Sequence, residues 1–146
     1  MTDAREQSLE EIEGNAWGSA PTDATRLIAT VHRLRRKPIS RLNVEDLRIM
    51  LGQQVGLPVL VPEALVVLEH DPLAEGAFYP GDLLSVVIRR TPEEYWVAHP
   101  DELMRLHALV TGINLDEVDD DELVADLAAF REGGTSQPPE PSPGLP

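Results

Sequence analysis

The chain contains no cysteine, which excludes disulfide bonds, thiol nucleophiles and thiolate metal sites. Aromatic residues are scarce at 4%, with two each of Phe, Trp and Tyr. Cations are scarce as well, since 12 Lys and Arg stand against 26 Asp and Glu and give a net charge of −14. Such an acidic chain repels nucleic acids and anionic membranes and favours a basic partner. We therefore expect neither nucleic-acid nor membrane binding.

Long apolar runs are also missing. The most apolar stretch, Leu57 to Leu68, is interrupted by Pro58, Pro62 and Glu63 and is too short to span a bilayer. The first eight residues lack the apolar core of a secretory signal. Together with the absence of cysteine, these features predict a cytoplasmic protein.

The length of 146 residues and the hydrophobic content of 42% suit one globular domain. Five of the 13 prolines fall in the last nine residues, behind Gly133-Gly134. Such a segment cannot bury enough apolar surface to offset the entropy lost on ordering. We predict a flexible N-terminus over 1–7, a folded domain over 8–132 and a disordered Pro/Gly-rich tail over 133–146.

Apolar residues recur at helical spacing through most of the predicted domain. The first helices are expected from Thr22 to Arg36, from Asn43 to Gly52 or Gly56, and over 62–70 with Pro62 in the first turn. Further helices are expected after a capping box at 91–94, from Pro100 to Gly112, and after the acids of 119–122. The segment 82–90 fits a buried helix or a strand, and helix is preferred because no partner strand alternates nearby. The fold class is all-α, with seven to eight short helices.

Residue patterns that would indicate catalysis or metal binding are absent from the sequence. The four histidines lack metal-binding spacing, Ser85 is not in a G-x-S-x-G motif, and Gly52 to Gly56 is not a phosphate-binding loop. The acidic run from Asp116 lacks the glycine that a calcium loop requires. We therefore expect no enzyme, no cofactor and no metal.

Two charged segments have structural and functional interpretations. The acids of 116–122 fit the first turn of a helix, where they favour the helix dipole, and they also fit a docking surface for a basic partner. Segment 26–48 has seven cations and two acids, a local charge of +5. Because the field of the whole chain opposes nucleic-acid binding, we expect these cations to pair with the acids of 9–13 or 116–122.

A series of short motifs runs in order through residues 34–84. It begins with L-R-x-K-P, E-D-L-R and L-V-P-x-A-L, and it continues with D-P-L and E-G-x-F/Y-Y-x-G-D-L-L. Together with Trp17 and Trp96, this series resembles the immunity proteins of bacterial contact-dependent growth inhibition systems over roughly 8–97. One departure is Ala77, where a polar residue, commonly Asp, is expected. The motif residues that we expect to hold the fold are Leu34, Arg35, Lys37, Pro38, Glu45, Asp46, Leu47, Arg48, Pro62, Asp71, Pro72, Gly76, Phe78, Tyr79, Gly81 and Asp82.

The resemblance implies a protein that binds and neutralises the C-terminal toxin domain delivered by a neighbouring cell. Many such toxins are nucleases with basic substrate-binding surfaces, which suits the acidic charge of this chain. Inhibition would occlude the toxin's active site or an exosite, and the oligomeric state stays open. The contact candidates are exposed acids outside the motif series, namely Glu93, Glu94, Asp119, Asp120, Asp121 and Glu122. A helical adaptor or transcription-associated interaction module is the alternative, with an enzyme that uses an unrecognised acidic site third.

The stretch "EGAFYPGDLL" carries two of the six aromatic residues. Gly76 and Pro80-Gly81 permit a reversal of the chain before Asp82 starts the next apolar element. We expect Phe78 and Tyr79 to fold back onto the core at this corner, because burial beside a turn is the common outcome for aromatic side chains.

Overall fold

The helical fold class is confirmed. A computed structural model describes residues 4–133, which form eight α-helices, three short 3-10 helices and no strand. The predicted tail lies outside the described residues from position 134 on, as do residues 1–3. The α-helices are α1 Leu9–Glu13, α2 Arg26–Leu34, α3 Val44–Gly52, α4 Leu57–His70, α5 Asp82–Arg90, α6 Glu93–Ala98, α7 Pro100–Thr111 and α8 Asp121–Gly133; the 3-10 helices are η1 Ala4–Glu6, η2 Ile39–Arg41 and η3 Leu115–Glu117.

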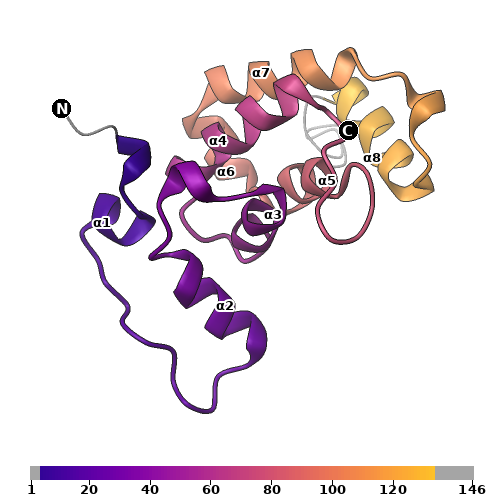
Figure 1. Ribbon diagram of the computed structural model, residues 1–146. Helices are drawn as coiled ribbons and strands as arrows, with labels where there is room; N and C mark the ends of the chain where they lie inside the picture. Colours follow the sequence, from indigo (N-terminus) through magenta and orange to yellow (C-terminus); the bar gives the residue numbers. More distant parts are fainter. Residues whose placement is uncertain (1–3, 134–146) are drawn as a thin grey trace, which may run out of the picture.

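Helix α4 forms the centre of the fold and packs against α3, α5 and α7 (Figure 1). It is apolar on several sides, as expected for a central helix, and the buried residues are Leu60, Val61, Ala64, Leu65 and Leu68. Helix α8 packs against α7 and α5 and closes one end of the domain. The Arg131 guanidinium of α8 donates to the carbonyl oxygens of Val110, Thr111 and Ile113, so a cation satisfies the C-terminal end of α7.

Helices α1 and α2 lie on the side of the molecule away from α8, and a long connection joins them (Figure 1). Helix α2 contacts α3, and η1 contacts η2. The segment joining α2 to α3 also returns to the N-terminus, because Ser8 and Pro38 form a β-bridge. Leu34, a residue of the motif series, and Ile39 are both buried. The junction between α2 and α3 is therefore part of the hydrophobic core.

The predicted start of the helix expected from Thr22 to Arg36, which is α2, is wrong. It begins at Arg26 and not at Thr22, because the hydroxyl oxygen of Thr25 accepts the N–H of Ile28 at 3.2 Å and acts as the cap. Ala24 donates to the carbonyl oxygen of Pro21, which places residues 21–24 in a turn before the helix. The predicted cap Asn43 of α3 is confirmed, and α3 ends at Gly52.

The predicted start of the central helix is also wrong. Gly56, with a φ of 69°, precedes a helix that begins at Leu57, and Pro58 occupies its first turn. Pro62 therefore lies inside α4, where it cannot donate to the carbonyl oxygen of Pro58. Burial of the apolar residues around Pro62 offsets the missing hydrogen bond.

Helix α6 lacks the predicted capping box. Pro92 is the residue before the helix, no side chain caps it, and the buried hydroxyl of Thr91 has no hydrogen-bond partner. The helix begins at Glu93, so Thr91 stands one residue before the cap position. The predicted short helix with Tyr95 and Trp96 is nevertheless present, and both rings are buried.

The segment 82–90 is a helix, as preferred over a strand. Its apolar residues are buried on α3, α4 and α8, and its two arginines lie at its C-terminal end. Helix α7 begins at Pro100 and is followed by Gly112, as predicted. Within residues 4–133, none of the helices combines the length and apolar character needed to cross a bilayer.

Candidate functional site

The turn between α4 and α5 is held by two carboxylates. Asp82 accepts hydrogen bonds from the N–H groups of Gly76 at 2.6 Å and Phe78 at 3.0 Å. Glu45, which comes from α3, accepts the intervening N–H of Ala77 at 2.8 Å. Three successive backbone donors are therefore satisfied by side chains from two packed helices, and hydrogen bonds to charged acceptors are the stronger kind.

Arg48 completes this cluster. Its guanidinium donates to both carboxylate oxygens of Glu45, at 2.6 and 2.5 Å, and lies 3.9 Å from an oxygen of Asp82. The hydrogen bonds from Arg48 hold the pKa of Glu45 below its ordinary value, with the Ala77 N–H acting in the same direction and burial opposing both. The lowered pKa favours the ionised form of Glu45, and hydrogen bonds to an ionised acceptor such as this one are the stronger kind.

Two glycines permit the close packing of the turn. A Cβ at Gly76 would stand 2.6 Å from a Glu45 oxygen and about 3 Å from both Asp82 oxygens. Gly81 has a φ of 94°, and a Cβ there would lie 2.5 Å from the Leu123 side chain of α8. The turn therefore contacts the first turn of α8 directly.

The prediction that Phe78 folds back onto the core is wrong. Its side chain is 68% exposed, whereas Tyr79 is half-buried and packs against the core. The Arg48 guanidinium lies 4.4 Å from the centre of the Phe78 ring, which is a cation–π arrangement. The three carboxylate-bound N–H groups fix the turn in a conformation that points Phe78 away from the apolar interior.

A second cluster ties the N-terminal elements together. Arg35 is completely buried and donates from Nη1 to Glu13 at 2.6 Å and from Nη2 to the carbonyl oxygen of Asn15. Its guanidinium also lies 4.1 Å from the Trp17 ring, and its backbone oxygen accepts the Glu10 N–H. Arg35 therefore joins α1 and the connection after it to the end of α2.

The pairing expected for the basic segment is confirmed only in part. Arg35 pairs with the acids of 9–13, as expected, but Lys37 and Arg48 pair with Asp46 and Glu45 inside the basic segment itself. Among the described residues no cation of 26–48 pairs with 116–122. Arg89 of α5 instead pairs with Glu122 and Asp126.

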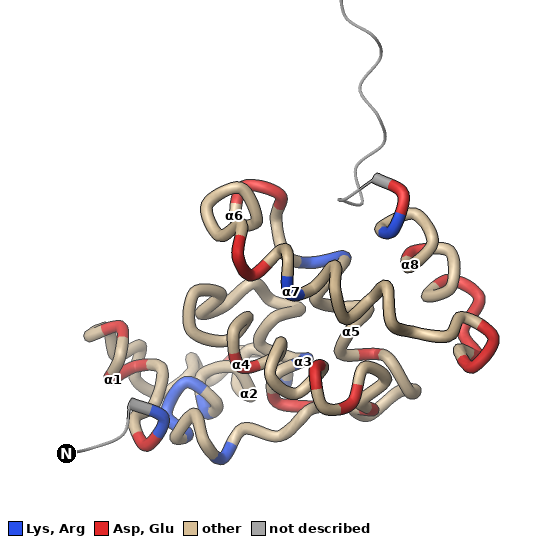
Figure 2. Tube along the Cα trace, turned by 90° about the horizontal axis from the view of Figure 1, so that it is seen from above, with Lys and Arg blue, Asp and Glu red and all other residues tan. Residues whose placement is uncertain are grey.

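The acidic contact candidates fall into two groups. Glu93 and Glu94 are exposed on α6, whereas positions 119–122 precede and begin α8. Figures 1 and 2 place α6 and α8 apart, with α5 and α7 between them. The structure therefore does not combine the candidates into one patch.

Members of the second group differ in their contacts. Asp120 accepts the N–H of Leu123 at 2.9 Å, which is the structural role expected for an acid at a helix start. Asp119, Asp121 and Glu122 are exposed, and within residues 4–133 only Glu122 of these three has an ion-pair partner, Arg89 at 3.4 Å. Their negative charge is therefore largely available to a partner.

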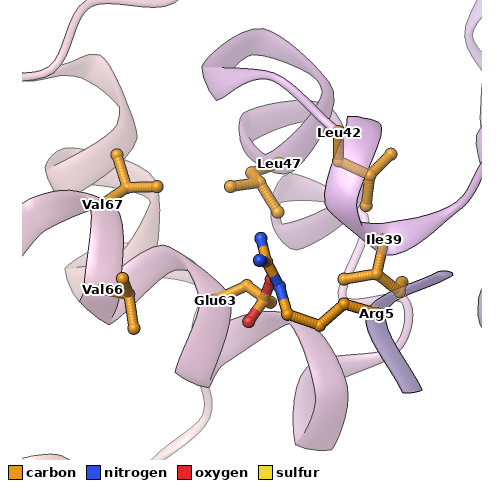
Figure 3. Close-up of a pocket in the computed structure, with 7 residues that line it drawn as sticks. All are labelled: Arg5, Ile39, Leu42, Leu47, Glu63, Val66 and Val67. Carbon is orange, nitrogen blue, oxygen red and sulfur yellow. The ribbon is translucent and has the colours of Figure 1, made fainter. Parts of the chain in front are cut away.

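One hollow lies between η1, η2, α3 and α4, where the Arg5 side chain crosses the opening and pairs with Glu63 at 2.8 Å (Figure 3). Its volume of about 220 Å³ is below the roughly 300–1,000 Å³ typical of small-molecule sites. Within residues 4–133 no group of three or more His, Asp or Glu side chains is arranged to hold a metal ion. The two charged clusters described above bind backbone groups of the turn before α5 and of the connection after α1.

Arg35, Glu45, Arg48 and Asp82 belong to the motif series expected to hold the fold, but the sequence does not indicate that the last three form one cluster or that Arg35 is buried. Glu45 and Arg48 are three residues apart, a spacing that places them side by side on a helix and could have indicated the pair. No local pattern indicates that this pair meets residues 76–78, because that contact depends on the packing of α3 against α5.

The fold and its clusters define an all-α protein whose distinctive surface features are charged and aromatic. A family model described as CDI immunity proteins matches residues 11–106, about two thirds of the chain. The chain therefore belongs to the immunity proteins of contact-dependent growth inhibition systems, as the motif series predicts. The comparisons with curated proteins and with solved structures gave no significant match. The match covers α6 and half of α7, and it ends before the acids of 116–122.

Proposed function

We propose that this protein binds the cognate C-terminal toxin domain of a contact-dependent growth inhibition system in the cytoplasm and neutralises it. Membership of the immunity family supports toxin binding as the function. Inhibition follows from occlusion of the toxin's active site or of an adjoining exosite, with no chemical step in the inhibitor. A basic toxin surface, as in a nuclease, fits the charge of −14.

The observation that supports the proposal beyond the family is the distribution of acidic residues. Residues 93–132 contain 12 acidic and two basic residues, a local charge of −10. Figure 2 shows this charge on α6 and around the start of α8. Like charges within each of these two groups repel each other, and a basic partner relieves that repulsion while it is attracted by the field of the whole chain.

Co-expression tests the proposal. The toxin domain encoded by the gene immediately upstream is expressed with and without this chain, and growth is recorded. We expect rescue of growth and co-purification of the two proteins as a stable complex. Toxicity that persists with soluble immunity protein present, together with no complex on purification, would falsify the proposal.

A further inference from the structure

Phe78 is an exposed aromatic side chain on a turn of fixed shape. Its exposed fraction of 68% exceeds that of Trp17, the other strongly exposed aromatic residue, at 43%. The turn around it is closed by a β-bridge between Glu75 and Pro80. Phe78 is not part of the hydrophobic core, so core packing does not require an aromatic ring at this position, and its ring contacts the Arg48 guanidinium.

The turn is organised before any partner arrives. Its N–H groups at 76–78 are bound by the carboxylates of Asp82 and Glu45, and these two residues belong to α5 and α3, which pack directly on each other. Asp82 is only 2% exposed. The Phe78 ring rests on a guanidinium that Glu45 holds at two points. Binding through Phe78 would therefore lose little conformational freedom, which is the main cost of ordering a surface side chain.

The surroundings of the turn are acidic. Glu75 is exposed beside Phe78, and Gly81 packs against Leu123 at the start of α8. Figure 1 shows the loop before α5 lying next to α8. Asp119, Asp121 and Glu122 therefore lie on the segment that adjoins the turn. The combination is an apolar anchor with a charged border, which is the usual anatomy of a specific protein interface.

We propose that Phe78 is an anchor residue for the toxin domain, inserting into an apolar socket on the toxin that is bordered by lysine or arginine side chains. This inference rests on the proposed function. The socket excludes water from the Phe78 ring and from Arg48, and a cation–π contact gains strength when it is desolvated. The acids at the start of α8 meet the basic border of the socket.

Substitution of Phe78 tests the anchor. Affinity for the upstream-encoded toxin domain is measured by titration calorimetry for the wild type, Phe78→Ala, Phe78→Leu and Ile28→Ala. We expect a loss of about 30-fold for Phe78→Ala, as for a hot-spot residue, and a smaller loss for Phe78→Leu. Ile28 is the control, because its side chain is 45% exposed and belongs to α2, which carries none of the contact candidates. Thermal unfolding should be nearly the same for all four proteins, since neither position is buried.

Photo-crosslinking gives an independent test of position. Benzoylphenylalanine at position 78 should crosslink to the toxin domain, and the same residue at position 28 on α2 should not. If the wild type binds the toxin while Phe78→Ala binds within threefold of it, or position 78 gives no crosslink, the anchor is refuted and the proposed function stands. If the wild type itself does not bind, the proposed function fails and the anchor with it.

Discussion

The cations of residues 26–48 and the acids of residues 93–132 are used in opposite ways. Three of the cations in the first segment, Arg35, Lys37 and Arg48, are bound by carboxylates within the fold. Acids of the second segment such as Glu93, Glu94 and Asp101 are exposed and have no ion-pair partner among the described residues. The paired cations of the first segment stabilise the fold, whereas these acids of the second segment remain exposed on the surface.

The difference follows the family motifs. The paired cations Arg35, Lys37 and Arg48 belong to L-R-x-K-P and E-D-L-R, whereas Arg26, Arg33, Arg36 and Arg41 are exposed and lie outside the motif positions. Desolvating a charge is expensive unless it is paired and hydrogen-bonded. The motif cations are therefore constrained by their partners, whereas the exposed acids have no such constraint.

The largest effect in this comparison is expected for Arg35→Ala. Loss of the buried guanidinium leaves the Asn15 carbonyl oxygen and Glu13 without their donor and creates a cavity, and we expect a loss of roughly 3 kcal/mol in the free energy of unfolding. Chemical denaturation measures it. Arg36→Ala is the matched control, because Arg36 is exposed and should change stability by less than about 0.5 kcal/mol. Equal stability of the two variants would remove the distinction between motif and surface cations.

Asp82→Ala should have the next largest effect. The substitution leaves the N–H groups of Gly76 and Phe78 without acceptors, and we expect a loss of about 2 kcal/mol, as for hydrogen bonds to a charged group. Asp82→Asn keeps one acceptor oxygen and should lose less. The control is Asp101→Ala on the exposed surface of α7. A change at Asp82 no larger than that at Asp101 would contradict the role assigned to the cluster.

Charge reversal at Asp119, Asp121 and Glu122 tests the acidic segment, with Asp120 left in place to cap α8. We expect toxin association to slow about tenfold at low salt and to depend less on salt, because steering by complementary charge is lost. Stopped-flow kinetics measures both. The variant with Glu93 and Glu94 reversed separates the two candidate surfaces, since α6 and α8 lie apart. Unchanged association rates would exclude the reversed segment from the interface.

The smallest effect concerns pH. The pKa of Glu45 is lowered in the folded state by Arg48 and the Ala77 N–H. A lowered folded pKa gives a stabilisation that is present above the unfolded pKa and is lost as the pH falls through the folded pKa. The stability of Glu45→Gln should therefore fall less than that of the wild type below about pH 4.5. The difference should be under roughly 1 kcal/mol for a partly exposed pair.

Denaturation across the acidic range measures this difference, with exposed Glu75→Gln as the control. If the wild type and Glu45→Gln lose stability identically as the pH falls, the pair of Glu45 and Arg48 does not contribute to the pH dependence of stability.

Several elements followed from local rules. Asn43 is the cap of α3 and Pro100 opens α7, as the local signals predict. Segment 82–90 is helical, as preferred because no partner strand alternates nearby. Errors arose where two local signals competed. Thr22 and Thr25 could each cap a helix, and Pro58 and Pro62 could each start one, so the choice depended on turns that the pattern does not specify.

The sequence by itself determined the helical class, seven of the eight α-helices of the described residues in their order, the negative charge and the family. Each depends on composition, on spacing along the chain or on a series of short motifs. Only the tertiary structure decided that Arg35 is buried and Phe78 exposed. The packing of α3 against α5 brings Glu45 and Asp82 to the same three N–H groups. In the turn held by these carboxylates, the Phe78 ring points away from the core. Whether a side chain of this turn is buried depends on which distant groups accept hydrogen bonds from the backbone around it. Those contacts exist only in the folded chain.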